Sequence, residues 1–304
     1  MVLSMLKAWL KRSVLWLGLL LCLYAIWHLR TQAGDAIGRL DIVAWLCLVL
    51  LLAAGWLFAV MSWRQYLQAY TQLDPGWRVA MRQVGLLLVG KYVPGGVFGF
   101  LARMYDEPGA PRLRLFWAGL AEQVVALAMP LALGGLLYLT ASQRNLGWLC
   151  LIVLLPLLGL VGVWLLHRLA VRLPWLSSRI ASAEAPGGWM LLAAIVVQLV
   201  QQLVWVALVA ILVRELFGLD IYAALGVAGA FWWGVVLGMM VVFVPGGIGV
   251  REAALIGLAS IWLDTTQAVL ISASLRLLST MLDAGAGCVA AALGPRRGFG
   301  GRTT

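Results

Sequence analysis

Apolar runs long enough to cross a lipid bilayer recur along the whole of this sequence. A helix needs about 20 apolar residues to cross the hydrocarbon core, and 63% of the 304 residues are hydrophobic whereas only 11% are charged. Soluble domains carry about 25% charged residues, and a soluble fold of this length has too little interior to bury so much apolar surface. The sequence therefore predicts an all-α, polytopic membrane protein with a single integral membrane domain, residues 1–304.

Six of the apolar segments have the length expected of full membrane spans. They cover residues 13–29, 42–63, 115–139, 146–167, 189–213 and 266–293. Basic residues concentrate in the short segments before, between and after these spans, so the net charge of +10 follows the positive-inside rule and is not a nucleic-acid signal. We therefore expect a multi-pass protein of the cell (inner) membrane with both termini in the cytoplasm.

Residue usage and motifs argue against several other classes. The four cysteines lie inside apolar runs and show neither a metal-ligand spacing nor a CxxC pair. The sequence contains no HExxH, GxSxG or Walker motif, which argues against a metalloenzyme, a serine hydrolase and direct use of ATP. We expect no cofactor, no metal and no enzymatic activity, and a driving force that is either an ion gradient or passive equilibration.

Two further apolar segments are each interrupted by a Val-Pro-Gly-Gly tetrad. The interruptions are Pro94, Gly95 and Gly96 within residues 79–102, and Pro245, Gly246 and Gly247 within residues 221–262. Proline removes a backbone donor and glycine adds backbone freedom, so a helix is expected to break at each tetrad. Broken backbone at membrane depth is tolerated only where protein or a water-filled cavity satisfies its polar groups. These segments are therefore predicted to be re-entrant hairpins that face a cavity.

The charges around the hairpins favour entry from opposite faces. Arg103, Arg112 and Arg114 follow the first hairpin, and they stay in the cytoplasm only if that hairpin enters from the cytoplasm and returns. If the second hairpin enters from outside, the basic tail of the chain is cytoplasmic. The alternative is a full crossing by residues 221–244 with re-entry from inside, which leaves the tail outside. Broken helices at matching positions of two halves are typical of inverted-repeat transporters, so an inverted repeat is a hypothesis here.

The two interrupted segments resemble the signatures of a known membrane family. KYVPGGVFGFLAR (91–103) and VPGGIGVREAAL (244–255) are similar to the paired motifs of the lysylphosphatidylglycerol synthase transmembrane region family, which includes the flippase portion of the multiple peptide resistance proteins. Glu122 and Arg276 are further matches, whereas Gln123 stands where family members often have arginine. The resemblance covers nearly the whole chain. It implies a stand-alone translocation module, without the aminoacyl-transferring domain, that handles lipid or lipid-linked substrates.

Charged residues inside the predicted spans are the candidates for a substrate site, because charges within a membrane usually face the protein interior or a cavity. The cationic candidates are Lys91, Arg103, Arg251 and Arg276, and the acidic candidates are Glu122, Glu252 and Asp283. Together with the two tetrads they form the predicted substrate-binding set. Lys91, Arg251 and Arg276 would hold a lipid phosphate, assisted by free N–H groups of the half-helices that follow each Gly-Gly. The acids would balance these cations when the site is empty, and could accept an amine or a proton.

A purely structural interpretation of the same charges is also open. It pairs Glu122 with Arg276, and Arg251 with an acid, only to hold helices together. Three glutamines, Gln198, Gln201 and Gln202, share one helical face and are expected to form interhelical hydrogen bonds. Most of the 16 tryptophans are expected to be interfacial anchors.

The expected function is that of a lipid flippase or transporter. It would move a phospholipid or a lipid-linked head group, such as a polyprenyl-linked glycan, between leaflets through a polar cavity at mid-membrane. The alternative is a membrane partner or scaffold subunit of a lipid or glycan synthesis enzyme. The expected partner is therefore a lipid substrate, and both a homo-oligomer and a complex with a synthase are compatible with the sequence.

Overall fold

The computed structural model describes residues 40–72, 74–93, 98–106, 112–143, 187–241 and 245–294, with a few isolated positions before residue 40. The predicted span at residues 146–167 lies outside the described residues, as does nearly all of the one at 13–29. Pro94, Gly95 and Gly96 of the first tetrad also lie outside the described residues.

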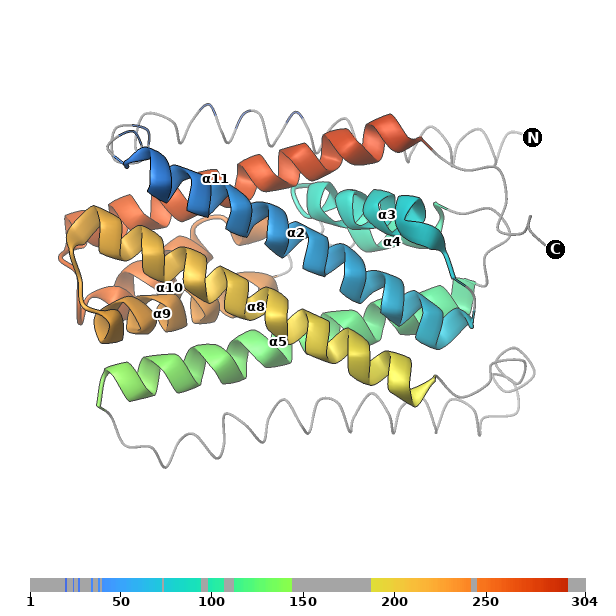
Figure 1. The fold of residues 1–304 in the computed structure, drawn as a ribbon, viewed down its shortest axis with the longest axis horizontal. Helices are drawn as coiled ribbons and strands as arrows, with labels where there is room; N and C mark the ends of the chain where they lie inside the picture. The colour runs from blue at the N-terminus through green and yellow to red at the C-terminus, as the bar shows by residue number, and fades with distance from the viewer. Residues whose placement is uncertain are drawn as a thin grey trace.

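The described part is helical throughout, and it contains eight α-helices and one short 3-10 turn (Figure 1). The helices are α2 (Ile42–Thr71), α3 (Gly76–Gly90), α4 (Phe98–Met104), α5 (Arg112–Ala141), α8 (Gly188–Phe217), α9 (Ile221–Met240), α10 (Val250–Ala259) and α11 (Thr265–Leu293), and the turn is η1 (Pro245–Gly247). Five of them, α2, α5, α8, α9 and α11, are long and apolar enough to cross a membrane. The chain is a helical membrane protein, as its apolar runs predict.

The same order of elements occurs twice. A long helix, a helical hairpin and a second long helix form α2 to α5, and the order recurs in α8 to α11. The first long helices of the two halves, α2 and α8, pack against each other in antiparallel directions, and the amide N of Gly187 donates to the carbonyl O of Ala69 where α8 begins. The last long helix of each half packs on the hairpin of the other half, α5 on α9 and α11 on α3.

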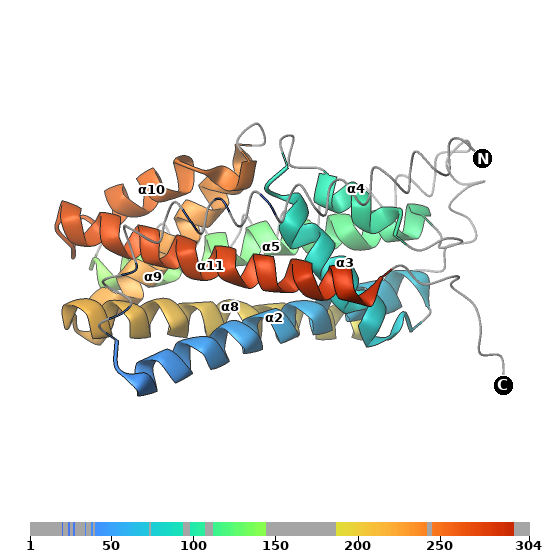
Figure 2. The same ribbon diagram turned by 90° about the horizontal axis from the view of Figure 1, so that it is seen from above.

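The two hairpins begin at opposite ends of the bundle, as Figures 1 and 2 show. In the first, α3 and α4 are antiparallel: Gly90 and Gly99 are in backbone contact at the tip, and the Arg82 Nε lies 2.9 Å from Asp106 Oδ1 at the base. In the second, α9 and α10 are antiparallel. The chain returns to the beginning of α9, where Trp262 packs on Gly226.

Arginine side chains tie together the end of the bundle where the first hairpin begins. Arg82 lies within α3, is buried, and donates to both Asp106 and the carbonyl O of Ala290. Arg64 of α2 donates to Asp74 in the loop between α2 and α3, and this hydrogen bond lowers the pKa of the Asp74 carboxyl to about 2. Pairing of this kind keeps part of the positive charge at this end neutralised.

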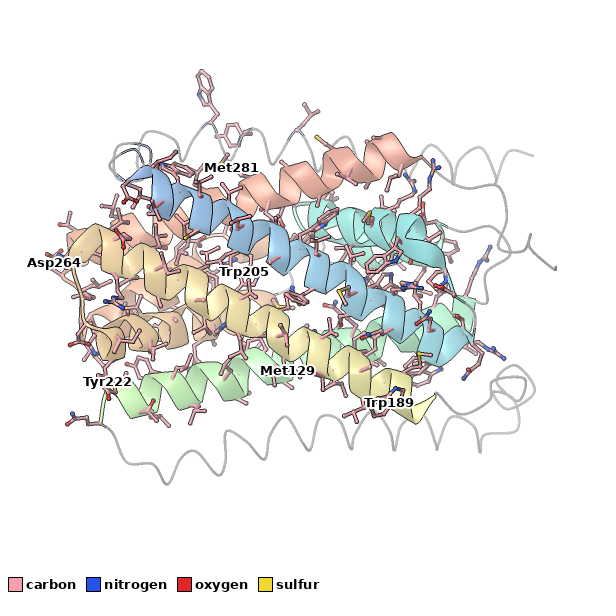
Figure 3. All side chains as sticks on the ribbon, in the orientation of Figure 1. Met129, Trp189, Trp205, Tyr222, Asp264 and Met281 are labelled. Carbon is pink, nitrogen blue, oxygen red and sulfur yellow. The ribbon has the colours of Figure 1, made fainter. Side chains whose placement is uncertain are left out.

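Aspartates begin three helices at the opposite end. Asp41, Asp220 and Asp264 are the N-caps of α2, α9 and α11, and each side chain accepts a hydrogen bond from a backbone N–H in the first turn. Asp264, labelled in Figure 3, also forms a reciprocal capping box with Gln267, with bonds of 2.9 and 3.2 Å. The negative charge at this end is therefore explained by helix capping.

Removing the Asp264 cap tests this explanation. Because the first-turn N–H of Gln267 would lose its acceptor, Asp264→Ala is expected to lower the free energy of unfolding by about 1 kcal/mol. Asp264→Asn keeps an acceptor oxygen and should lose only a fraction of that. Both are measured by denaturant unfolding in detergent micelles, and equal losses in the two variants would contradict the capping role.

Candidate functional site

The end of α3 meets the second tetrad inside the bundle. The backbone N–H of Gly246, in the second tetrad, donates to the carbonyl O of Lys91, which directly follows α3, at 2.9 Å. The carbonyl O of Gly246 accepts from Arg276 Nη1, also at 2.9 Å. Gly246 and Gly247 have φ values of 59° and 67°, a left-handed conformation that favours glycine. The hairpin tips are thus joined to each other and to α11 through backbone groups.

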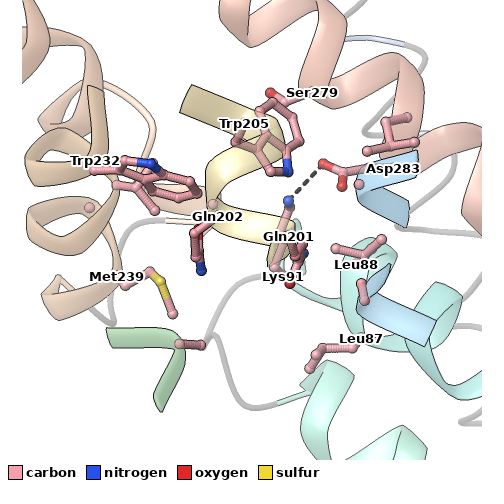
Figure 4. A pocket seen from close by; sticks show the side chains of 18 of the residues that line it. Leu87, Leu88, Lys91, Gln201, Gln202, Trp205, Trp232, Met239, Ser279 and Asp283 are labelled. Carbon is pink, nitrogen blue, oxygen red and sulfur yellow. Dashed lines mark ion pairs between the residues drawn. The ribbon is translucent and has the colours of Figure 1, made fainter. Parts of the chain in front are cut away.

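A cavity of about 450 Å³ lies beside this junction. Its volume falls within the range of about 300–1,000 Å³ that is typical of ligand pockets. Of the predicted site residues in the described part, six line it: Lys91, Glu122, Gly246, Gly247, Arg251 and Asp283. Figure 4 shows Lys91 and Asp283 on its wall together with Gln201, Gln202 and Trp205 from α8.

Lys91 is anchored to the last long helix. Its Nζ lies 2.7 Å from Asp283 Oδ2, the ion pair drawn in Figure 4. The neighbouring Tyr92 hydroxyl donates to the same carboxylate at 2.7 Å and lies 3.2 Å from the Thr280 hydroxyl. The Asp283 side chain is only 3% exposed, whereas that of Lys91 is 37% exposed. Asp283 is therefore a buried anchor, and Lys91 is the partner that a ligand can reach.

Arg276 lies next to the cavity wall without lining the cavity. Its side chain is 6% exposed, and its Nη1 lies 3.5 Å from Glu252 Oε1, beyond hydrogen-bond length. The other Glu252 oxygen accepts from the N–H of Gly249 at 2.6 Å and caps α10. Arg276 Nη2 is buried without a hydrogen-bond partner. Arg276 thus holds the second hairpin tip through Gly246 and retains an unused donor.

The structural interpretation of the sequence paired Glu122 with Arg276, but Glu122 does not pair with Arg276. It pairs with Arg103, with N–O distances of 2.5 and 3.0 Å in a bidentate geometry. The guanidinium of Arg103 also stacks 3.3 Å from the centre of the Trp63 ring, and the side chain is 2% exposed. Arg103, predicted as a substrate ligand, does not line the cavity and joins α4 to α2 and α5. Sequence alone does not show this partner, because the pairing depends on how α4 packs.

Arg251 is a cation on the cavity wall that forms no ion pair with an acid in the described part of the chain. Its guanidinium lies 4.6 Å from the centre of the Phe231 ring. Within the described residues no carboxylate forms an ion pair with it, so the expectation that it pairs with an acid is wrong for this part of the chain. An unpaired cation on a cavity wall is suited to binding an anion.

The glutamines of α8 line the cavity, and one of them also forms hydrogen bonds to other helices. Gln198 accepts from the Tyr66 hydroxyl at 2.9 Å and contacts the carbonyl O of Glu122 at 3.5 Å, which confirms the predicted interhelical bonding. All three glutamines line the cavity, and the Oε1 of Gln202 is buried without a hydrogen-bond partner among the described residues. Their wall position could not be read from the shared helical face alone.

Three cavity-lining tryptophans were missed by sequence reasoning. Trp56, Trp205 and Trp232 lie on α2, α8 and α9, away from the helix ends. Figure 3 shows the contrast between Trp189, at the beginning of α8, and Trp205, midway along it. A position in the middle of a span was the available signal, because interfacial anchors lie at span ends.

Comparison with known proteins adds no relatives. No protein-family model matches the chain, and no curated protein matches its sequence. Among the described residues, no three metal-ligating side chains gather in one place. The features that bear on the role of the site are the cavity, the Arg251 guanidinium on its wall and the hydrogen bond that joins Lys91 to Gly246.

Proposed function

We propose that this protein is a lipid flippase or transporter that moves a phospholipid or lipid-linked head group between leaflets. The observation that carries the proposal is the cavity of about 450 Å³ at the hairpin junction, with Lys91 and Arg251 on its wall. A head group enters this cavity while its acyl or prenyl chains stay in the bilayer. The cations bind the phosphate, since charge-assisted bonds to phosphate are among the strongest hydrogen bonds in proteins.

The charge distribution supports a definite placement in the membrane. The end where the first hairpin begins carries Arg64, Arg78, Arg112 and Arg114, whereas the other end carries the three aspartate caps. By the positive-inside rule the first end is cytoplasmic. The first hairpin then enters the membrane from the cytoplasm, and the second enters from the opposite face. With 15 residues in α3 and 20 in α9, the tips reach roughly 22 and 30 Å into the bundle. The cavity lies near mid-membrane in this placement.

An inverted repeat supports transport by alternating access. Each hairpin ends in a short helix that forms an ion pair with the next long helix: Arg103 with Glu122 in the first half, and Glu252 with Arg276 in the second. In the first half the arginine lies on the short helix and the glutamate on the long helix, and in the second half this order is reversed. The first pair is bidentate and the second is 3.5 Å long, so the two hairpins are held unequally in this conformation. Rocking of one repeat against the other around a fixed midplane site is the common mechanism of such folds.

The resemblance to the lysylphosphatidylglycerol synthase transmembrane region family agrees with this proposal. Both of its motifs contribute to the site: Lys91 from the first, and Gly246 and Arg251 from the second. We therefore propose that the chain belongs to that family, as a translocation module that acts on lipids.

A lipid translocation assay that compares two arginine variants tests the function. Purified protein is reconstituted in vesicles with a trace of fluorescent phosphatidylglycerol, and dithionite added outside reports the lipid that reaches the outer leaflet. Because Arg251→Gln removes the unpaired cation of the cavity, it is expected to slow translocation by about tenfold or more. The matched control Arg214→Gln changes an exposed arginine at the end of α8 and should leave the rate unchanged.

Two outcomes would count against the proposal in different ways. Absence of translocation for every phospholipid and polyprenyl phosphate tried would remove the transport function and favour a scaffold subunit. Equal rates for Arg251→Gln and wild type would leave transport standing but remove the cavity as its route.

A further inference from the structure

The cavity wall combines one surplus charge with a neutral polar surface. Three ion pairs surround the site, Lys91–Asp283, Arg103–Glu122 and Arg276–Glu252, and within each the formal charges cancel. Among the described residues at the cavity, Arg251 alone then remains uncompensated, so the empty site has a formal charge of +1. A single phosphodiester carries one negative charge and would neutralise it.

The remaining polar wall is uncharged and comes largely from α2, α8 and α9. It includes the amides Gln201 and Gln202 and the indoles Trp56, Trp205 and Trp232. Figure 4 shows Gln201, Gln202, Trp205 and Trp232 around the same space as Lys91. Trp205 is stacked on Phe231, with ring centroids 6.0 Å apart, so these rings form a rigid apolar surface.

Among the described residues, three polar atoms of this neutral wall have no hydrogen-bond partner. Gln202 is 5% exposed and its Oε1 accepts no hydrogen bond, and Trp232 is 6% exposed and its Nε1 donates none. The Nε1 of Trp56 is also buried and unpaired. Buried polar groups in proteins are nearly always satisfied, so an unpaired set at a cavity indicates that a ligand supplies the partners. One acceptor and two donors match hydroxyl groups, each of which both donates and accepts.

We infer that the cavity binds a phosphodiester lipid whose head group is a neutral sugar or polyol, an inference that rests on the proposed flippase function. The phosphate pairs with Arg251 and Lys91, the hydroxyls bond the amides and indole N–H groups, and the C–H face of the ring packs on tryptophan. A cationic head group is disfavoured because its ammonium would enter a site that already has a surplus positive charge. Ethanolamine and aminoacylated head groups are therefore poor substrates.

The test measures head-group preference in phosphatidylcholine vesicles that contain one fluorescent lipid each. The lipids are phosphatidylinositol, phosphatidic acid and phosphatidylethanolamine, which offer a polyol, no head alcohol and an ammonium. Wild type is expected to move phosphatidylinositol at least about tenfold faster than the other two. Gln202→Leu removes the side-chain amide and Trp232→Phe removes the indole N–H, and each is expected to reduce that preference about fivefold. Trp232→Phe keeps an aromatic ring, so it separates the lost donor from lost packing.

Controls and a soluble competitor complete the experiment. Trp189→Leu alters a tryptophan that is 78% exposed and distant from the cavity, and it should keep the full preference. Inositol 1-phosphate added to the vesicles distinguishes a lipid from a free sugar phosphate. Inhibition without uptake supports the lipid, whereas uptake of the soluble phosphate without lipid movement overturns it. Equal wild-type rates for the three lipids, or faster movement of phosphatidylethanolamine, would overturn this inference while leaving the flippase function intact.

Discussion

Arg103→Leu is expected to lower the free energy of unfolding by about 3–5 kcal/mol, because it leaves a buried carboxylate without its counter-charge. Glu122 would lose both of its bonds to the guanidinium, at 2.5 and 3.0 Å, and it is itself 9% exposed. The Trp63 ring would lose the cation stacked on it. The measurement is denaturant unfolding in detergent micelles, followed by tryptophan fluorescence.

Two matched variants separate the unpaired charge from lost packing. Arg103→Lys keeps the charge but cannot form the bidentate fork, so an intermediate loss is expected. The double variant Arg103→Leu with Glu122→Leu removes both charges, and it should recover most of the stability that Arg103→Leu loses. A double variant at least as unstable as Arg103→Leu would show that the pair is not what stabilises this contact.

Gly247→Ala is expected to lower the free energy of unfolding by about 3 kcal/mol and to separate η1 from α9 in the second hairpin. The residue has a φ of 67°, and an alanine in that conformation costs about 1–2 kcal/mol. Its Cβ would also lie 2.8 Å from the Cα of Gly238 on α9, which adds about 1–3 kcal/mol of overpacking. Since both contacting groups are backbone, no side chain can move aside. Unfolding in micelles measures the loss, and the lipid translocation assay should show slower translocation.

The same hairpin provides two controls for this substitution. Gly249→Ala has a φ of 85° but no atom within 4 Å of the new Cβ, so it should show the conformational cost alone. Gly257→Ala lies within α10 and also faces open space, and it is expected to stabilise the helix by about 1 kcal/mol. Equal losses at Gly247 and Gly249 would mean that the approach of η1 to α9 does not matter for stability.

Small residues explain how both hairpins pack so closely. Gly234 on α9 faces the backbone of Arg251, and a Cβ there would lie 2.8 Å from its carbonyl O. In the other half, Gly85 on α3 contacts the backbone of α11, and a Cβ would lie 2.7 Å from that of Ala290. Close backbone approach through small residues is characteristic of helix packing in membranes. The abundance of glycine in this sequence therefore serves packing as well as the breaks.

Helix existence could be predicted from the sequence, but helix ends could not. Residues 42–63 were predicted as a span, and the helix continues from Ile42 to Thr71. Hydropathy identifies only the part that matches the hydrocarbon core, whereas the backbone hydrogen bonds of a helix continue past the first charged residue. The first hairpin shows the same effect, since α3 begins at Gly76 and α4 ends at Met104, on either side of residues 79–102.

The sequence by itself determined the class of the protein, the position of its second break and the charged residues on its cavity wall. These are local properties: apolar runs, a proline beside two glycines, and charges that are costly in lipid unless they face a protected interior. Only the tertiary structure decided the partners. Arg103 meets Glu122, Lys91 meets Asp283 across the two halves, and Arg251 forms no ion pair with any described acid. The packing of the helices decides which counter-charge a residue meets, whereas the pattern along any one helix does not.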